Sequence, residues 1–174
     1  MEFRQLIQAR RSVRAYEKAP AHEDLVEILK MAQMAPSWKN MQASRCYVAE
    51  GAETLEKLKN ALHPANQKKP GPAALIVTTY VKDQVGFTKG EPDNEVGNGW
   101  GAYDLGLHDA YLVLAASEMG YDTLIMGLRD AQQIRQILSI PENEEVMAVI
   151  AVGKRAEEPL LRPRKPLEET VKFF

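Results

Sequence analysis

Cysteine and histidine are scarce in this chain of 174 residues. The one cysteine, Cys46, excludes an internal disulfide and a cluster of thiolate metal ligands. The three histidines are scattered without the short spacing of zinc or iron ligands: His22, His63 and His108. We therefore predict no metal site. A chain without disulfides is typical of a reducing compartment, and we expect a cytoplasmic protein.

Long apolar runs and the common nucleotide-binding loops are also missing. No apolar run approaches the ~20 residues needed to span a bilayer, and the first residues, MEFRQ, lack the apolar centre of a secretion signal. No G-x-G-x-x-G or P-loop pattern follows a predicted strand. The sequence thus predicts no membrane association, and any phosphate site has to be built from other residues.

What remains is the composition of an ordinary globular domain. Charged residues make up 26% and apolar residues 45% of the chain, and the net charge is -2. We expect one domain over residues 1–174. Three prolines predict that residues 153–174 form an extended C-terminal arm: Pro159, Pro163 and Pro166.

Apolar periodicity predicts the main elements. Helices are expected at residues 2–11, 22–34, 53–62 and 102–119, and from a cap at Asp130 to about Ser139. Strands are expected at residues 45–50, 73–80, 123–126 and 145–153. The run AALIVTTY is typical of a central strand buried on both faces, and the glycine-rich residues 82–101 are expected to be irregular. This order suits a mixed α/β or α+β domain with four or five strands, and a doubly wound fold is left open.

Two clusters of arginine lie near opposite ends of this mildly acidic chain. The first contains Arg10, Arg11, Ser12 and Arg14, and the second contains Arg162, Arg164 and Lys165. A guanidinium fork matches two phosphate oxygens, and a serine hydroxyl can complete such a site. If folding brings the clusters together, they form one pocket for a phosphorylated cofactor. The alternatives are a solvated basic patch and a nucleic-acid-binding tail, and the overall acidity disfavours the latter.

Two further segments carry groups suited to a heterocyclic ligand. The loop after the second helix is dense in hydrogen-bonding groups and includes one large ring: Pro36, Ser37, Trp38, Asn40 and Gln42. The strand at 123–126 ends at Gly127, which would let a ligand approach the main chain closely. An ordinary polar loop and a simple turn are the alternatives for these two segments.

In their order along the chain, these segments resemble the FMN-dependent nitroreductase family. The resemblance spans almost the whole chain and is carried by RRSVR, APS-x-x-N-x-Q, LIMG, LSIP before AVIAVG, and RPRKPLEE. It implies an α+β, nitroreductase-like fold with a central, mostly antiparallel sheet flanked by helices. It also implies a homodimer in which residues 153–174 are exchanged onto the partner subunit and FMN lies at the interface.

The resemblance assigns roles to particular residues. The phosphate and ribityl oxygens would be held by Arg10, Arg11, Ser12, Arg162 and Arg164, and Arg14 would lie near flavin N1. The partner chain would supply Pro36, Ser37, Trp38, Asn40 and Gln42. Asn66 and Lys69 would contact the pyrimidine edge, and the main-chain N–H groups of Met126 and Gly127 would point at flavin N5. Many members of the family have a glutamate where this chain has Met126.

The implied activity is that of a flavin-dependent oxidoreductase. FMN would accept a hydride from NADH or NADPH and reduce a nitroaromatic, a quinone or a similar small electron acceptor by a ping-pong mechanism. No catalytic side chain is expected, and no Cys/His or Ser/His/Asp constellation is evident in the sequence. The alternatives are a non-catalytic or redox-sensing flavin-binding protein, and a related flavin chemistry such as reductive dehalogenation or flavin destruction.

Overall fold

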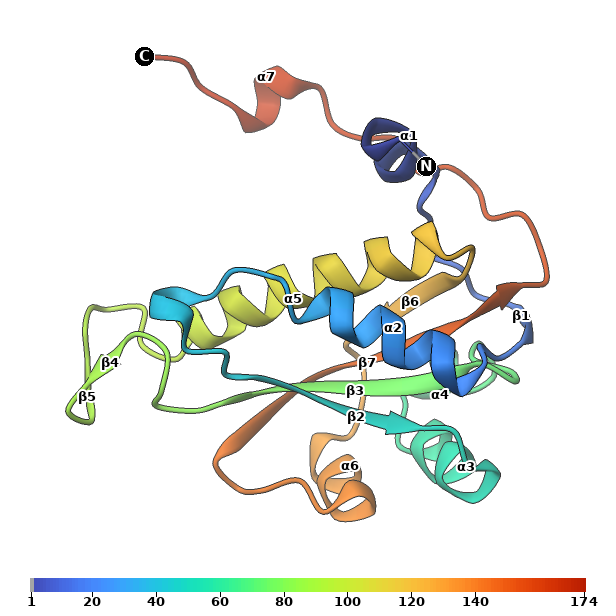
Figure 1. Ribbon diagram of the computed structural model, residues 1–174, viewed down its shortest axis with the longest axis horizontal. Helices are drawn as coiled ribbons and strands as arrows, with labels where there is room; N and C mark the ends of the chain where they lie inside the picture. Colours follow the sequence, from blue (N-terminus) through green and yellow to red (C-terminus); the bar gives the residue numbers. More distant parts are fainter. Residues whose placement is uncertain (1) are drawn as a thin grey trace.

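The computed structural model describes residues 2–174, which form a five-stranded sheet between two layers of helices (Figure 1). The strand order is β1(Tyr16–Lys18), β7(Glu144–Arg155), β3(Ala74–Val81) and β2(Ser44–Ala49), and β6(Asp122–Met126) also pairs with β7. Every pair of these strands is antiparallel. The fold is therefore α+β, as the resemblance implied, and the doubly wound alternative is wrong.

The two helical layers follow from the alternation of side chains along the central strands. On one face, α2(His22–Ala32) and α5(Gly99–Glu118) pack against the sheet, and α3(Ala52–Asn60), α4(Pro64–Gln67) and α6(Ala131–Leu138) cover the other face (Figure 1). In β3, Ile76 belongs to the core under α2 and α5, whereas Leu75 and Val77 belong to the opposite core. All three are fully buried, which confirms the prediction of a strand buried on both faces.

Most of the predicted elements are confirmed with shifted ends. The first helix, α1(Phe3–Ala9), stops before the arginine cluster, and Asp130 caps α6 by accepting the N–H of Gln133 at 2.9 Å. Helix α5 begins at Gly99 rather than Ala102. Strand β7 continues to Arg155, whose guanidinium bonds both oxygens of the buried Asp122. The arm therefore starts after Arg155 and not at residue 153.

The elements missed by the sequence analysis are short. They are β1, α4, the hairpin of β4(Phe87–Thr88) and β5(Glu91–Pro92), the 3-10 turn Trp38–Asn40, and α7(Leu167–Thr170) within the arm. Each has four residues or fewer. Such a segment is too short to show an apolar period.

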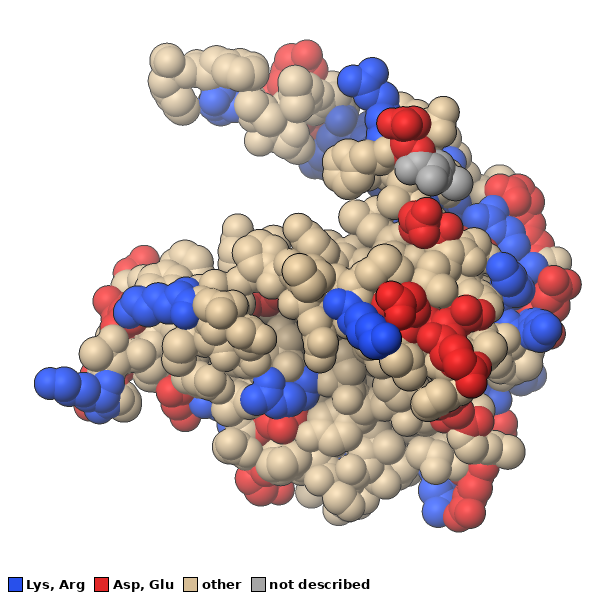
Figure 2. Space-filling view, in the orientation of Figure 1, with Lys and Arg blue, Asp and Glu red and all other residues tan. Residues whose placement is uncertain are grey.

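The arm leaves the body at the end of β7, passes beside α1 and continues away from the sheet (Figure 1). Residues 160–174 are exposed throughout. The space-filling view shows a wide opening between this arm and the body of the molecule (Figure 2). Among residues 2–174, no helix combines the length and apolar character needed to cross a membrane.

Candidate functional site

A groove of about 600 Å³ lies between α5 and the end of β6. Three residues from the predicted set line it: Arg10, Ser12 and Gly127. Its floor and walls are mostly small or apolar, with Ala102, Leu105, Gly106, Ala110, Val113, Ile125, Met147 and Ala148. Small-molecule and cofactor sites have volumes of roughly 300–1,000 Å³, and the groove lies within that range.

The N-terminal arginine segment reaches the groove because it is bound to β6. The N–H of Val13 donates to the carbonyl of Thr123 at 3.0 Å, and Ser12 forms a parallel bridge with Thr123. The Val13 side chain is fully buried, and its carbonyl accepts the Tyr16 hydroxyl at 3.0 Å. The segment is therefore packed against the body of the protein. Arg10 and Ser12 are therefore held at the edge of the sheet.

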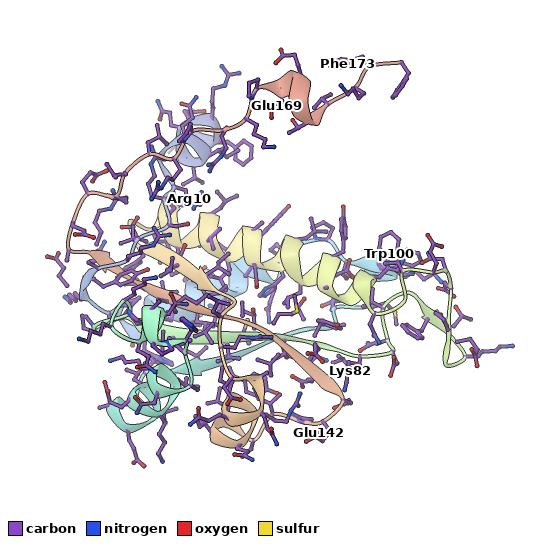
Figure 3. The ribbon with its side chains drawn as sticks, turned by 180° about the vertical axis from the view of Figure 1, so that it is seen from behind. Arg10, Lys82, Trp100, Glu142, Glu169 and Phe173 are labelled. Atoms are coloured by element: carbon purple, nitrogen blue, oxygen red, sulfur yellow. The ribbon has the colours of Figure 1, made fainter. Side chains whose placement is uncertain are left out.

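One residue of the second arginine cluster, Arg164, lies close enough to Arg10 at this edge for their charges to interact, although Arg164 does not line the groove. Burial lowers the pKa of the Arg10 guanidinium, and the nearby positive charges of Arg164 and Arg11 lower that pKa further. Arg10 lies where α1 joins the body, close to the path of the arm (Figure 3). Within residues 2–174, no ion pair joins Arg10 or Arg164 to a carboxylate. Like charges brought together without a counter-charge favour the binding of an anion.

The other predicted arginines have different surroundings. The guanidinium of Arg11 donates to the carbonyl oxygens of Gln8 and Arg10 at the end of α1. Arg14 is exposed and makes a long contact of 3.4 Å with the Ser12 carbonyl. Arg162 is exposed on the arm, where its carbonyl accepts from Arg164 at 3.3 Å. These three side chains are not among those that line the groove.

Gly127 opens the main chain to the groove at the end of β6. A Cβ atom added there would have no atom of the described chain within 4 Å, apart from its chain neighbours. Met126, just before it, is buried and pairs with Val149 of β7. A planar ligand could therefore approach the backbone at Gly127 closely, as the sequence suggested.

A second hollow, of about 420 Å³, lies between α2, β2 and another face of α5. Pro36, Ser37 and Gln42 line it, together with Asp104 and His108 of α5. Helix α5 thus separates two groups of predicted residues, which cannot both touch one small ligand within a single chain. Asn40 is exposed in the same loop, and the Trp38 ring lies 4.6 Å from the Trp100 ring.

Asn66 and Lys69 contact one another rather than either hollow. Lys69 Nζ donates to Asn66 Oδ1 at 2.7 Å, and neither residue is among the lining of the groove or of the second hollow. The chain just before them is tied to the turn after Gly127, because the His63 N–H donates to the Leu128 carbonyl at 3.0 Å.

A buried polar cluster beside the groove was missed by the sequence analysis. Cys46 Sγ lies 3.9 Å from His108 Nε2, and His108 Nδ1 lies 3.2 Å from Asp109, which lines the groove. These residues are far apart in the sequence, so their contact was not evident there. Burial, followed by the charge of Asp109, raises the pKa of the half-buried Cys46 thiol to about 12. A thiol with that pKa stays protonated at neutral pH and is a poor nucleophile.

The fold and the groove together define an α+β protein with a largely apolar groove, bordered by Arg10, at the edge of an antiparallel sheet. The chain belongs to the nitroreductase family, whose sequence profile matches residues 7–154. It is 27% identical to a protein named NADH dehydrogenase from Thermus thermophilus, over 93% of this chain and 91% of the relative. It is 26% identical to an NADPH-dependent oxidoreductase from Staphylococcus aureus, over 94% of this chain and 69% of the relative.

Solved structures share the fold over nearly the whole length. One, described as an oxidoreductase containing FMN, superposes with a TM-score of 0.83 at 26% identity, over 96% of this chain and 89% of that chain. A nitroreductase family protein from Clostridium novyi superposes with a TM-score of 0.77 at 26% identity, over 89% of this chain and 87% of that chain.

Proposed function

We propose that this protein binds FMN and acts as an NAD(P)H-dependent oxidoreductase of small electron acceptors. The observation that carries the proposal is the meeting of Arg10 and Arg164 without a carboxylate partner in residues 2–174. The groove fits this cofactor because it joins a site for a doubly negative ester to an apolar slot with open main chain at Gly127. The names of the relatives and the FMN-containing structure support both the donor and the cofactor.

In this proposal each group of residues has its own part. Arg10, Arg164 and the Ser12 hydroxyl bind the phosphate, with Arg11 and Arg162 adding positive charge nearby. The main-chain N–H groups of Met126 and Gly127 donate to the ring system. The family resemblance assigns Asn66 and Lys69 to the pyrimidine edge, although neither lines the groove of a single chain. Arg14, also outside that lining, would supply positive charge that stabilises added negative charge nearby.

FMN, when bound, supplies hydride exchange between a nicotinamide and a small acceptor such as a nitroaromatic or a quinone, one after the other. The chain contributes binding, orientation and electrostatics. The apolar groove walls exclude water from the ring, which strengthens the effect of every charge beside it.

We also propose a homodimer. Pro36, Ser37, Trp38, Asn40 and Gln42 lie on the side of α5 away from the groove, so a second copy is required to bring their equivalents to the same flavin. The arm carries large apolar side chains that one chain leaves uncovered: Leu160 is 81%, Leu161 69% and Phe173 86% exposed. Packing this arm on the partner subunit would bury them.

The function is tested with the purified protein and its cofactor-free form. We expect a yellow protein that takes up FMN, whose flavin is reduced by NADH or NADPH without oxygen and reoxidised by nitroaromatic or quinone acceptors. A protein that binds FMN without reduction by either nicotinamide would favour the flavin-binding or sensing alternative. Turnover with halogenated acceptors alone would favour dehalogenation. A colourless protein that does not take up FMN would overturn the proposal.

The phosphate site is tested by combining Arg10→Ala with Arg164→Ala. Hydrogen bonds to charged groups contribute about 1.5–3 kcal/mol each, so FMN affinity should fall by about a hundredfold or more. The variant should remain folded, because the substitutions relieve repulsion between like charges. Fluorescence titration measures the affinity and thermal unfolding the stability. A matched variant, Lys30→Ala with Lys57→Ala, removes two exposed charges elsewhere; equal affinities in both variants would refute the assignment.

A further inference from the structure

The loop of residues 36–42 has an unusual backbone. Lys39, Asn40 and Gln42 have φ angles of 48°, 57° and 50°, in the left-handed region that favours glycine. Residues with side chains adopt this region at an energetic cost, so several of them so close together persist only if the surroundings hold them there. Contacts with the rest of the chain must therefore stabilise the backbone of this loop.

Helix α5 holds the loop at Trp38. Trp100 and Asp104 are four positions apart and so lie on one face of the helix. The Trp100 ring packs on the Trp38 ring, and Asp104 Oδ2 accepts the Trp38 N–H at 2.8 Å. Trp100 is itself fixed, because its indole N–H donates to Asn94 Oδ1 at 2.9 Å and a Cβ at Gly86 would come within 2.6 Å of its ring.

Burying the Asp104 carboxylate at this position is energetically unfavourable by itself. Its residue is only 4% exposed, and no ion pair in residues 2–174 includes it. A buried carboxylate costs free energy unless hydrogen bonds compensate it, so packing alone would favour an apolar residue. The bond to Trp38 is the contact that explains its presence. Asp104 also lines the second hollow beside Ser37, whose Oγ accepts the N–H of Gln42 at 3.0 Å.

We infer that Asp104 is a positioning residue that fixes the loop of residues 36–42 in the conformation that presents Ser37 and Asn40 to the flavin held by the partner subunit. The presentation step, in which Ser37 and Asn40 contact the flavin of the partner subunit, rests on the proposed function. The other step, in which Asp104 fixes the loop, concerns this chain alone and is tested without cofactor.

The first test measures hydrogen exchange of the Trp38 amide in the FMN-free protein. Asp104→Ala removes the acceptor, and exchange at Trp38 should become at least about tenfold faster. Asp104→Asn keeps an oxygen acceptor in place, and exchange should stay within about threefold of the wild type. Unchanged protection of the Trp38 amide in Asp104→Ala would overturn the inference.

A matched control separates this effect from general loss of stability. Glu144 is also buried and accepts from Thr79 and Tyr47, whose side chains lie on the other face of the sheet. Glu144→Ala should lower the stability and leave local exchange at Trp38 unchanged. If Asp104→Ala does not fold, Asp104→Ser replaces it, because a serine hydroxyl is too short to reach Trp38 and can bond a carbonyl of its own helix.

The second test measures FMN affinity by fluorescence titration. Asp104→Ala should bind FMN at least about tenfold more weakly, with Asp104→Asn within about threefold of the wild type. Faster exchange at Trp38 with unchanged affinity would overturn the presentation step. If the wild type binds no FMN, the proposed function and the presentation step fail together, and the exchange comparison still decides whether Asp104 holds the loop.

Discussion

Gly127 shows what a missing side chain contributes to the groove. It lines the groove directly after β6, next to Met126, which is in register with Val149, and no atom of the described chain lies within 4 Å of the place where a Cβ would be, apart from its chain neighbours. Its φ is not in the left-handed region, so the backbone alone does not require glycine. A side chain at position 127 should therefore affect cofactor binding without affecting folding.

We predict that Gly127→Ala folds normally and binds FMN at least about tenfold more weakly, because the added methyl group occupies the space nearest the main chain. A loss of about 1.4 kcal/mol corresponds to that factor. Thermal unfolding of the cofactor-free protein and FMN titration measure the two effects. Gly51→Ala is the matched control, since Gly51 also has an open Cβ position and a negative φ of -72°. If Gly127→Ala binds FMN as tightly as the wild type, the flavin ring does not lie against the main chain at residue 127.

For individual residues, the sequence predicts members of short motifs better than contacts between residues that are distant in the chain. The family resemblance that these motifs carry predicted one site for Arg10, Ser12 and Gly127, and all three line one groove. The cluster of Cys46 and His108 could not be found in that way. Those residues are 62 positions apart and meet only because β2 packs under α5.

Strand β1 connects the arginine segment to the sheet through Tyr16. Tyr16 is buried, and its hydroxyl donates to the Val13 carbonyl at 3.0 Å. Burial, and after it the charge of Asp122, raises the pKa of the Tyr16 hydroxyl well above its ordinary value. Burial, followed by carboxylate neighbours, also raises the pKa of Tyr47 and Tyr80. The pKa of Tyr121 is raised chiefly by its hydrogen bond to Asp24, and then by burial. The fold thus favours the neutral form of several tyrosines.

The free energy of unfolding should therefore fall in alkaline solution. Each raised pKa contributes stability that is fully present below the unfolded value of about 10 and is lost as the pH rises through the folded value. Urea unfolding from pH 7 to 11 should give a curve that declines above about pH 10. Tyr16→Phe should cost about 1 kcal/mol at pH 7 and reduce the alkaline decline.

Tyr103→Phe is the control for this prediction, because Tyr103 is 60% exposed and should leave the curve unchanged. An alkaline decline in Tyr16→Phe equal to that of the wild type would show that the Tyr16 hydroxyl is not the group responsible.

Element prediction succeeded where the apolar pattern is long. Helices α2, α3 and α6 and strands β3 and β7 are within a few residues of the expected ranges, since each repeats its pattern more than once. Strand β1 has three residues and bends at an irregular register against β7, so its position depends on Arg155 and Asp122 rather than on a local pattern. Hairpin β4–β5 is closed by a hydrogen bond from the Asp93 N–H to the Gly86 carbonyl at 2.7 Å, and Gly86 lies close to the Trp100 ring.

At the scale of the whole molecule, the C-terminal arm is the segment whose apolar side chains a single chain leaves exposed. It runs beside α1 and then away from the body (Figures 1 and 3). Exposed apolar side chains lie before α7, within it and after it. The family resemblance predicted its exchange between subunits. The path that brings Arg164 near Arg10 could not be derived from the sequence, because prolines set the stiffness of an arm and not its direction.

We predict that removing residues 157–174 leaves the sheet folded and shifts the protein toward the monomer. The reason is that residues 160–174 are exposed and no residue of the removed segment belongs to either core. Circular dichroism checks the fold and light scattering the mass. FMN affinity should also fall, because Arg164 is lost. Replacing Leu160, Leu161 and Phe173 with serine keeps both arm arginines and should weaken association, so FMN affinity should fall only at protein concentrations at which the dimer dissociates. A dimer of undiminished affinity in both variants would show that other surfaces hold the subunits together.

The left-handed residues of the loop at 36–42 also bear on protein engineering. Positions 39, 40 and 42 are exposed, so a mutagenesis library guided by accessibility would treat them as freely variable. Their backbone angles instead select glycine, asparagine and aspartate and select against valine, isoleucine and proline. Randomising this stretch to change acceptor preference would thus yield fewer useful clones than its accessibility promises, and a restricted alphabet at these three positions is the better starting design.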